Sequence, residues 1–336
     1  MKFENIFKNK IIVASICSLI LLLAIFFLTR GGYVKNFTNL PIEGDYTNIV
    51  IGPKQVFILK DGYIGSFSKE GKEIKRINLP LKGGNIVGDK DFIVYYSNAN
   101  IYLLDKSGKI KASQKLNFPI EDCVIKNNRA LAVGKNSYAV IDSSENIICK
   151  GKINGRIITY DLGDEKAIIT SIVKKDEEEN NVISFMYSVD LNDKKETVVT
   201  FPNELIFYSE AFQDGHVLTV SNIEARVMKD EVILGKKKIN DFKSARAYKN
   251  NIFILEDDKL GVYDLNLINQ KKMELKGDFS SLAILKDKVY LYNSKGFAMY
   301  ENGMVKDFVQ TEEVQDVIVN SSDIFFIHSN SISVEN

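Results

Sequence analysis

The sequence contains few of the residues from which metal sites and disulfide frameworks are built. Among 336 residues there are two histidines, three cysteines and no tryptophan. His216 and His328 lie far apart in the chain, each beside a strand-like pattern. We interpret both as structural residues, because a metal site or a catalytic base needs partners at short, defined spacing. No metal ligand and no cofactor is therefore predicted.

Catalytic motifs are also missing from the sequence. It holds no Ser/His/Asp order, no helical His-x-x-x-His, no paired Cys-x-x-Cys and no Walker loop. The glycine pairs Gly31-Gly32 and Gly83-Gly84 are too isolated to cradle a phosphate and are interpreted as corners. No catalytic residue is predicted, and an enzyme is not the expected class.

The charges of the chain balance, with 44 Lys and Arg residues against 44 Asp and Glu residues. A neutral chain has no overall field to attract a polyanion, so a nucleic-acid partner is not expected. The basic run Lys236-Lys237-Lys238 is interpreted as a solvated hairpin tip rather than a binding patch.

One long apolar run lies near the N-terminus, at residues 11–28, and it contains no charged residue. As a helix it would be roughly 27 Å long, enough to cross the hydrocarbon core of a membrane. Lys2, Lys8 and Lys10 precede the run, which favours a cytoplasmic N-terminus and an exported remainder. We expect a single-pass anchor in the cell membrane.

Two processing alternatives compete with an uncleaved anchor. A signal peptide would end in a small-residue cleavage pattern, and residues 26–30 offer none. A lipoprotein site at Cys17 is disfavoured because Ile16 precedes it and the cysteine lies inside the apolar run.

A short phrase repeats along the rest of the chain. Asn-Leu-Pro or Asn-Phe-Pro ends at Pro41, Pro80 and Pro119, which are 39 residues apart, and a weaker echo ends at Pro202. This spacing lies in the range of propeller blades and other repeat arrays.

Between these corners the sequence alternates apolar and polar residues in short runs, the period-two pattern of strands. Hairpin turns are predicted near Gly71, Gly108, Asn146, Asp193, Glu231, Leu267 and Gly303. Most of the steps between them are about 36 to 38 residues, as expected for four-stranded units. The fold class predicted is all-β, a β-propeller of about eight four-stranded blades, or about seven if the last strands pack irregularly.

The ends of the repeat region complement each other. The C-terminal strands lack an outer strand, whereas residues 34–40 precede a Pro corner just as outer strands do elsewhere. We expect residues 34–40 to complete the last blade and close the ring, which removes exposed sheet edges. The domains predicted are a cytoplasmic tail (1–10), the anchor (11–28), a linker (29–33) and the propeller (34–336). Outer strands begin on the lower face of the propeller, opposite the upper face on which each outer strand connects to the next blade. Because the linker is so short, we expect the lower face to lie near the membrane and the upper face to point outward.

Cys123 and Cys149 fall in the innermost and outermost predicted strands of one blade. Three strand spacings would separate them by about 14 Å, beyond the reach of a disulfide. We expect two free, buried thiols.

The stretch Ile101 to Ile110, which contains Asp105, Gly108 and Lys109, resembles the repeat of the quinoprotein-like (PQQ-type, WD40-like) β-propeller family. The chain is also similar to uncharacterised single-pass membrane propeller proteins of Gram-positive bacteria. The resemblance implies the propeller fold. The chain departs from the family because it has no tryptophan, and Ala112 stands near the position where the family's tryptophan docks neighbouring blades. No functional residue is carried over.

An acidic run interrupts the connection between the second and third strands of the fourth blade: Asp176, Glu177, Glu178 and Glu179. It is the candidate interaction loop, and a solvated loop tip and a weak cation site are the alternatives. The tyrosines Tyr95, Tyr96 and Tyr102 are interpreted as packing between blades rather than a sugar platform.

These observations predict a membrane-anchored, extracytoplasmic propeller that is a non-catalytic protein-binding or scaffold module of the cell envelope, with an envelope protein as partner. The alternative is a propeller that binds a ligand or cofactor, possibly an enzyme, through a site in the central funnel. A convergent cluster of Asp, Lys or Tyr around the axis would favour the alternative. A sensor is disfavoured because the cytoplasmic tail is about ten residues long.

Overall fold

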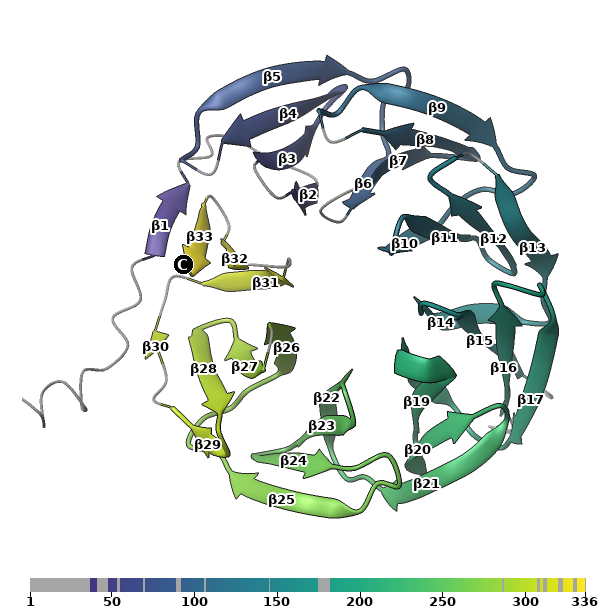
Figure 1. The fold of residues 1–336 in the computed structure, drawn as a ribbon, viewed down its shortest axis with the longest axis vertical. Coiled ribbons are helices and arrows are strands. Elements are labelled where there is room, and N and C mark those ends of the chain that lie inside the picture. Colours follow the sequence, from purple (N-terminus) through teal and green to yellow (C-terminus); the bar gives the residue numbers. More distant parts are fainter. Residues whose placement is uncertain are drawn as a thin grey trace, which may run out of the picture. The chain divides into compact units, whose positions relative to one another are not determined.

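The computed structural model describes residues 37–40 and 48–335, apart from short gaps at 53–54, 69, 89–91, 106, 145, 175–181, 286, 307–308, 311–312, 320–322 and 329–330. Contacts divide the chain into residues 38–334 and a second unit formed by residues 1–37 and 335–336. Within residues 38–334, eight β-sheets follow one another around a common axis (Figure 1). The predicted all-β propeller of eight blades is confirmed.

The strands of the first seven sheets pair antiparallel and occur in sequence order from the axis outward, and in the eighth sheet β31 and β32 also pair antiparallel. The first strands of blades 1 to 8 are β2 (Asn48–Ile51), β6 (Asn85–Gly88), β10 (Asp122–Lys126), β14 (Arg156–Leu162), β18 (Ile206–Phe212), β22 (Phe242–Tyr248), β26 (Ser281–Leu285) and β31 (Val314–Val319). The second strands are β3 (Gln55–Lys60), β7 (Ile93–Ser97), β11 (Arg129–Val133), β15 (Lys166–Lys174), β19 (His216–Ser221), β23 (Asn251–Glu256), β27 (Lys288–Asn293) and β32 (Ile324–His328).

The third strands are β4 (Tyr63–Ser68), β8 (Asn100–Leu104), β12 (Ser137–Asp142), β16 (Val182–Asp190), β20 (Glu224–Lys229), β24 (Lys259–Tyr263), β28 (Gly296–Glu301) and β33 (Ile332–Glu335). The outer strands are β5 (Glu73–Asn78), β9 (Ile110–Lys115), β13 (Ile147–Lys152), β17 (Glu196–Pro202), β21 (Val232–Lys238), β25 (Asn269–Glu274), the pair β29 (Met304–Val305) and β30 (Val309–Gln310), and β1 (Phe37–Leu40). One 3-10 turn, η1 (Gln213–Gly215), leads into β19.

The core lies between neighbouring sheets. Second strands such as β7 and β19 are buried along their whole length, because blades pack against both of their faces. Outer strands such as β5 are mostly exposed and carry charged residues. One apolar cluster joins Val94 and Leu103 of blade 2 to Ala130 and Ile141 of blade 3, and others repeat this arrangement around the ring.

The last blade is completed from the other end of the chain. Its strand order is β1-β33-β32-β31, so Phe37–Leu40 occupies the outer position. The N-terminal strand that the sequence predicts in this place is present over these residues. The upper face of the ring is the one that carries the connections from outer strands to the next first strands and from second to third strands.

The predicted anchor, residues 11–28, lies outside the described residues. In the part of the chain that the structure describes, no helix has the length and apolar character needed to cross a membrane. Tail, anchor and linker therefore stay predictions.

The repeated turns between third and outer strands share one mechanism. Asp105 Oδ1 accepts hydrogen bonds from the backbone N–H of Ser107 at 2.8 Å and of Lys109 at 3.0 Å. Asp142 and Asp264 accept equivalent bonds in blades 3 and 6, and Asp190 of blade 4 accepts from the N–H groups two and three residues on. Gly108 has a φ of 77°, and a Cβ at this position would collide with Ile77 of blade 1. This explains why an Asp is followed three residues later by a Gly in the turn from Asp105 to Gly108.

Two sequence interpretations are corrected here. Lys236, Lys237 and Lys238 lie in strand β21 rather than at a hairpin tip, and Lys237 Nζ contacts Glu256 at 2.7 Å. The run alternates within a strand, so its middle residue packs against the next blade while its neighbours are exposed. Cys123 is buried in β10, but Cys149 of β13 is only half-buried because outer strands face solvent on one side.

Candidate functional site

A small polar residue occupies the same position in the first strand of every blade. Strand pairing sets six of these residues opposite the last or second-to-last residue of the second strand, close to the upper face, whereas Thr159 and Ser209 lie opposite Thr170 and Thr219, further from the strand end. They are Asn48, Asn85, Asp122, Thr159, Ser209, Ser244, Ser281 and Asp316, which we call the polar ring. In β14, β18, β22 and β31 a β-bulge precedes the polar residue.

In blades 1 to 3 the polar ring links the blades through hydrogen bonds. Asn48 Nδ2 donates to Asn85 Oδ1 and to the Ile86 carbonyl, the second at 3.0 Å. Asn85 Nδ2 donates to the Tyr96 hydroxyl at 3.2 Å, which itself donates to Asp122 Oδ1 at 2.9 Å. Asp122 Oδ2 accepts a further bond from Tyr160 of blade 4. The chain of bonds crosses from blade 1 to blade 4.

In the next blades each contact joins only two groups, and neither group is charged. The hydroxyls of Thr159 and Ser209 lie 3.2 Å apart, across blades 4 and 5. Ser244 Oγ accepts from the backbone N–H of Leu282 at 3.2 Å, across blades 6 and 7. These hydrogen bonds therefore link blades 1 to 5, and blades 6 and 7, at the upper end of their first strands.

A cluster of ionisable side chains lies within two residues of the polar ring on β14, β18 and β22. The Tyr208 hydroxyl donates to Glu210 Oε2 and to the Ala245 carbonyl, both at 2.7 Å. Arg246 Nη1 donates to the Tyr208 hydroxyl at 3.0 Å and to the Ala245 carbonyl at 2.8 Å. Glu210 Oε2 also accepts from the Ala247 N–H at 3.0 Å. One hydroxyl thus joins a carboxyl group and a guanidinium.

Burial dominates the protonation of this cluster. It raises the pKa of Glu210 to about 7, although Arg246 and the Tyr208 hydrogen bond favour the charged carboxylate. Burial also raises the pKa of Asp161, against the attraction of Lys126 and the hydrogen bond from the Ala211 N–H. Perturbed carboxyl groups of this kind gather at functional sites more often than elsewhere.

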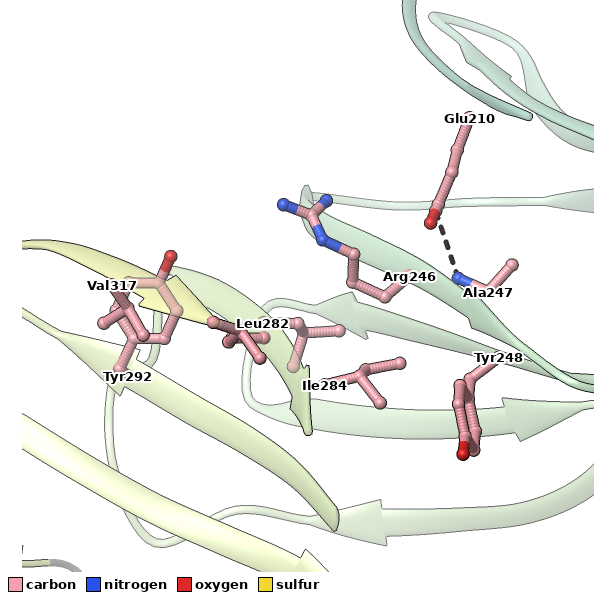
Figure 2. A pocket seen from close by; sticks show the side chains of 10 residues that line it. Glu210, Arg246, Ala247, Tyr248, Leu282, Ile284, Tyr292 and Val317 are labelled. Carbon is pink, nitrogen blue, oxygen red and sulfur yellow. Dashed lines mark hydrogen bonds between the residues drawn. The ribbon is translucent and has the colours of Figure 1, made fainter. Parts of the chain in front are cut away.

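A cavity of about 350 Å³ opens beside the cluster. Figure 2 shows the side chains that line it, with Arg246 extending from β22 toward the side on which Tyr292 and Val317 lie. The cavity is lined from the first strands of blades 5 to 8 by Glu210, Arg246, Ala247, Tyr248, Leu282, Ala283, Ile284, Val317 and Val319, and from β27 by Tyr292. It combines a charged end with an apolar wall.

A second feature lies on the upper face of blades 4 to 6. Ile158, Phe207 and Ile223 are 40%, 39% and 45% exposed. Ile158 and Phe207 are the bulged residues of β14 and β18, and the bulge leaves each without a partner across the sheet. The Phe207 ring packs on the Phe242 ring, with the ring centres 5.4 Å apart. We call these four residues the upper apolar patch.

The structure places the remaining candidate residues as follows. His216 and His328 are buried, and their Nδ1 atoms lie 2.9 and 3.0 Å from the carbonyls of Gln213 and Glu313. These contacts agree with a structural role, which stays a prediction. Tyr95 and Tyr96 are buried between blades, and Tyr95 stacks on Tyr102 with ring centres 5.6 Å apart, so the packing interpretation is supported.

The acidic run Asp176, Glu177, Glu178 and Glu179 lies outside the described residues. Its role as an interaction loop stays a prediction. Within the described ranges, no group of three or more His, Cys, Asp and Glu side chains is arranged to hold a metal ion.

The sequence interpretation missed both the polar ring and the charged cluster. A signal was available for the ring, because Asn48, Asn85, Asp122 and Thr159 follow one another at steps of 37 residues. No comparable signal existed for the cluster, since Arg246 and Glu210 occupy different positions in their blades and have no repeat equivalents.

Comparison with known proteins places the fold. No known family matches the sequence, and no curated protein resembles it in sequence. The structure is similar to Sqt1 of Saccharomyces cerevisiae, with a TM-score of 0.64, 12% identity, and coverage of 90% of this chain and 99% of that one.

Two bacterial structures are also similar. BamB from Moraxella catarrhalis gives a TM-score of 0.58 at 8% identity, covering 88% of this chain and 99% of that one. Apo AztD from Citrobacter koseri gives 0.54 at 11% identity, covering 81% and 88%. At these identities the likeness extends to the fold alone, and the quinoprotein-like and Gram-positive resemblances are not confirmed. What this chain shares with these structures is the β-propeller.

Proposed function

We propose that this chain is a non-catalytic, protein-binding propeller that is anchored in the cell membrane and displayed on its outer side. The observation that carries the protein-binding part is the upper apolar patch. Ile158 and Phe207 are 40% and 39% exposed. A polar residue would fit at either bulge, so the apolar side chains are not required by the fold. Exposed apolar side chains that lie together on a rigid scaffold favour a protein partner.

Contacts in the structure hold the patch together. The 3.2 Å approach of Thr159 and Ser209 brings the strand starts of blades 4 and 5 close to each other. The loop that carries Ile223 is tied to the start of β18, because Asn222 Oδ1 accepts from the Leu205 N–H at 2.9 Å. A preformed surface loses little conformational entropy when a partner binds.

The partner we propose is a loop of an envelope protein that presents an apolar side chain next to basic residues. The apolar side chain would pack on Phe207 and Ile158. The basic residues would pair with the acidic run Asp176 to Glu179, which belongs to blade 4 as Ile158 does. The resemblance to quinoprotein-like propellers and the anchor at residues 11–28 are part of this proposal, and both rest on the sequence.

In-cell crosslinking of the full-length chain, followed by mass spectrometry, tests the proposal. The same envelope protein should be recovered with the wild type and with Val232→Glu, and lost with Phe207→Glu. Val232 is the matched control because it is 61% exposed on outer strand β21, away from the patch. Loss with both variants or with neither would contradict the proposal. Protease digestion of intact cells tests the outward orientation, since an inward propeller would resist it.

One observation favours a second candidate function, a binding site for a small ligand near the axis. Tyr208, Glu210 and Arg246 converge there from two blades beside a cavity of about 350 Å³. Residues with only a structural role would not need a carboxyl group and a guanidinium beside a cavity.

A further inference from the structure

The charged pair in the cavity is joined through a hydroxyl rather than directly. Glu210 Oε2 lies 2.7 Å and Arg246 Nη1 3.0 Å from the Tyr208 hydroxyl. Among the described residues, no nitrogen of Arg246 comes within the 4.0 Å of a Glu210 oxygen that defines an ion pair. The Glu210 carboxyl group and the Arg246 guanidinium therefore lie apart in the cavity lining. Each can contact a different charged group of a ligand.

Both groups keep unused hydrogen-bonding capacity. Glu210 Oε2 accepts from Tyr208 and from the Ala247 N–H, whereas Oε1 has no hydrogen-bond partner in the part of the chain that the structure describes. Arg246 uses Nη1 for the Tyr208 hydroxyl and the Ala245 carbonyl. Its Nη2 and Nε groups have no acceptor among the described residues. A guanidinium with two free donors is suited to a carboxylate.

Part of the remaining cavity wall is apolar, and Tyr248 and Tyr292 also line it. Leu282 and Ile284 of β26 and Val317 of β31 lie alongside Arg246 (Figure 2), and Val319 of β31 also lines the cavity. A cavity of about 350 Å³ is at the small end of ligand sites, which span roughly 300–1,000 Å³. Its size and lining suit a small molecule with an aliphatic or aromatic body.

The balance of charge selects among small molecules. A simple anion on Arg246 would also face the carboxyl group of Glu210, with Asp161 and Asp316 nearby. A simple cation on Glu210 would face Arg246 and, through Asp161, Lys126. A molecule that carries both charges avoids both repulsions.

We propose that this cavity binds a free α-amino acid with an apolar side chain. The carboxylate accepts from Arg246 Nη2 and Nε, the ammonium donates to Glu210 Oε1, and the side chain packs against Leu282, Ile284 and Val317. This inference rests on the second candidate function, for which it names the ligand class, and it does not depend on the protein-binding function.

Ammonium binding requires the ionised form of Glu210, which links the affinity to pH. The pKa of about 7 means that part of the free protein carries a protonated Glu210 at neutral pH. The groups that face it are the Tyr208 hydroxyl, Arg246, Asp161 and the Ala247 N–H, with Lys126, Tyr292 and Asp316 further out. Binding should tighten as the pH rises from 6 to 8, with release of a fraction of a proton.

Isothermal titration calorimetry of the full-length chain in mild detergent tests the inference. The probes are L-leucine, L-isoleucine and L-phenylalanine, with 4-methylpentanoate and 3-methylbutylamine as analogues of leucine that lack one charge. At least one amino acid should bind, and each analogue should bind at least about tenfold more weakly than leucine. Arg246→Gln and Glu210→Gln should each weaken amino-acid binding by about tenfold or more, whereas Arg76→Gln on exposed strand β5 should not.

Binding of either analogue as tightly as leucine would overturn the inference, as would no binding of any of the three amino acids. If the Arg246 variant fails to fold, titrations of the wild type in two buffers of different ionisation enthalpy keep the inference testable. They should show proton release at pH 7 that disappears in Glu210→Gln. Equal heats in the two buffers would contradict the assigned role of Glu210.

Discussion

The first strands of blades 1 to 3 and those of blades 5 and 6 build the axis in different ways. In blades 1 to 3, Asn48, Asn85 and Asp122 are connected from blade to blade by hydrogen bonds. In blades 5 and 6, Glu210 and Arg246 share one hydroxyl and border a cavity. In blades 1 to 3 the polar side chains form hydrogen bonds with other protein groups. In blades 5 and 6, donors of Arg246 and an acceptor of Glu210 have no such partner among the described residues and can bind a ligand.

Local backbone geometry explains part of this difference. Strands β2, β6 and β10 pair with their second strands in unbroken register. Strands β18 and β22 each contain a bulge at the upper end, which shifts the residues that follow relative to the axis. We infer that the bulges free the later positions of these strands for charged side chains.

Removal of the closing strand should have the largest effect, because it disturbs both regions at once. A chain that lacks residues 1–40 loses β1, the outer strand of the last blade. We expect it to unfold with about 3–5 kcal/mol less free energy than a chain that lacks residues 1–29. Urea denaturation followed by circular dichroism measures the difference, and equal stabilities of the two truncated chains would show that β1 does not close the ring.

Asp122→Ala should disrupt the hydrogen-bonded region. Asp122 accepts bonds from the hydroxyls of Tyr96 and Tyr160 and from the Cys123 N–H. Three donors would lose their acceptor, and we expect a loss of about 2–4 kcal/mol in the free energy of unfolding. Asp287→Ala, at an exposed ion pair with Lys249, is the control and should change stability by less than about 0.5 kcal/mol. Similar melting temperatures for both variants would refute the importance of the polar ring.

Glu210→Gln should sharpen the comparison through pH. The pKa of Glu210 is raised from 4.5 to about 7, so the folded protein binds more protons than the unfolded chain between these values. The stability that this carboxyl group contributes is present below pH 4.5 and is lost as the pH rises through about 7. Between pH 5 and pH 8, the wild type should lose about 2–3 kcal/mol more than the variant.

Denaturation curves across that pH range measure this loss. Asp161 and Asp316 also have raised pKa values, but both are present in the variant, so the difference between the two proteins isolates Glu210. Parallel stability profiles would mean that Glu210 titrates near its ordinary pKa.

Tyr208→Phe should have the smallest effect and acts on the bridge itself. It removes the hydroxyl that contacts Glu210, Arg246 and the Ala245 carbonyl. We expect a loss of about 1 kcal/mol of stability and a further rise in the pKa of Glu210, because this hydrogen bond favours the carboxylate. The pH at which stability falls should move upward in the variant, and a downward movement would contradict the bridging geometry.

The sequence predicted most of the fold because the fold repeats. The hairpin turns expected at Gly71, Gly108 and Gly303 all have positive φ in the structure, as do those at Glu231 and Leu267. Turn residues and the alternation of apolar and polar residues in strands are local features, so they recur in the sequence of each blade. The interpretation of Lys236 to Lys238 as a hairpin tip was wrong because a strand residue can be exposed as fully as a loop residue.

The candidate site was much less predictable. Glu210 and Arg246 are separated by 36 residues and have no motif around them. Their meeting depends on which side of each first strand faces the axis and on the bulges in β18 and β22. A one-residue bulge leaves almost no trace in a pattern of alternating side chains.

By itself the sequence determined a chain of similar four-stranded units, its closing strand and an apolar N-terminal run, since local propensity and repetition encode all three. Tertiary structure alone decided what the axis contains. Glu210 and Arg246 are unremarkable in the sequence, but neighbouring blades bury the Glu210 carboxyl group and burial raises its pKa to about 7. Burial and convergence arise from the closed ring, and no short segment of the chain records them.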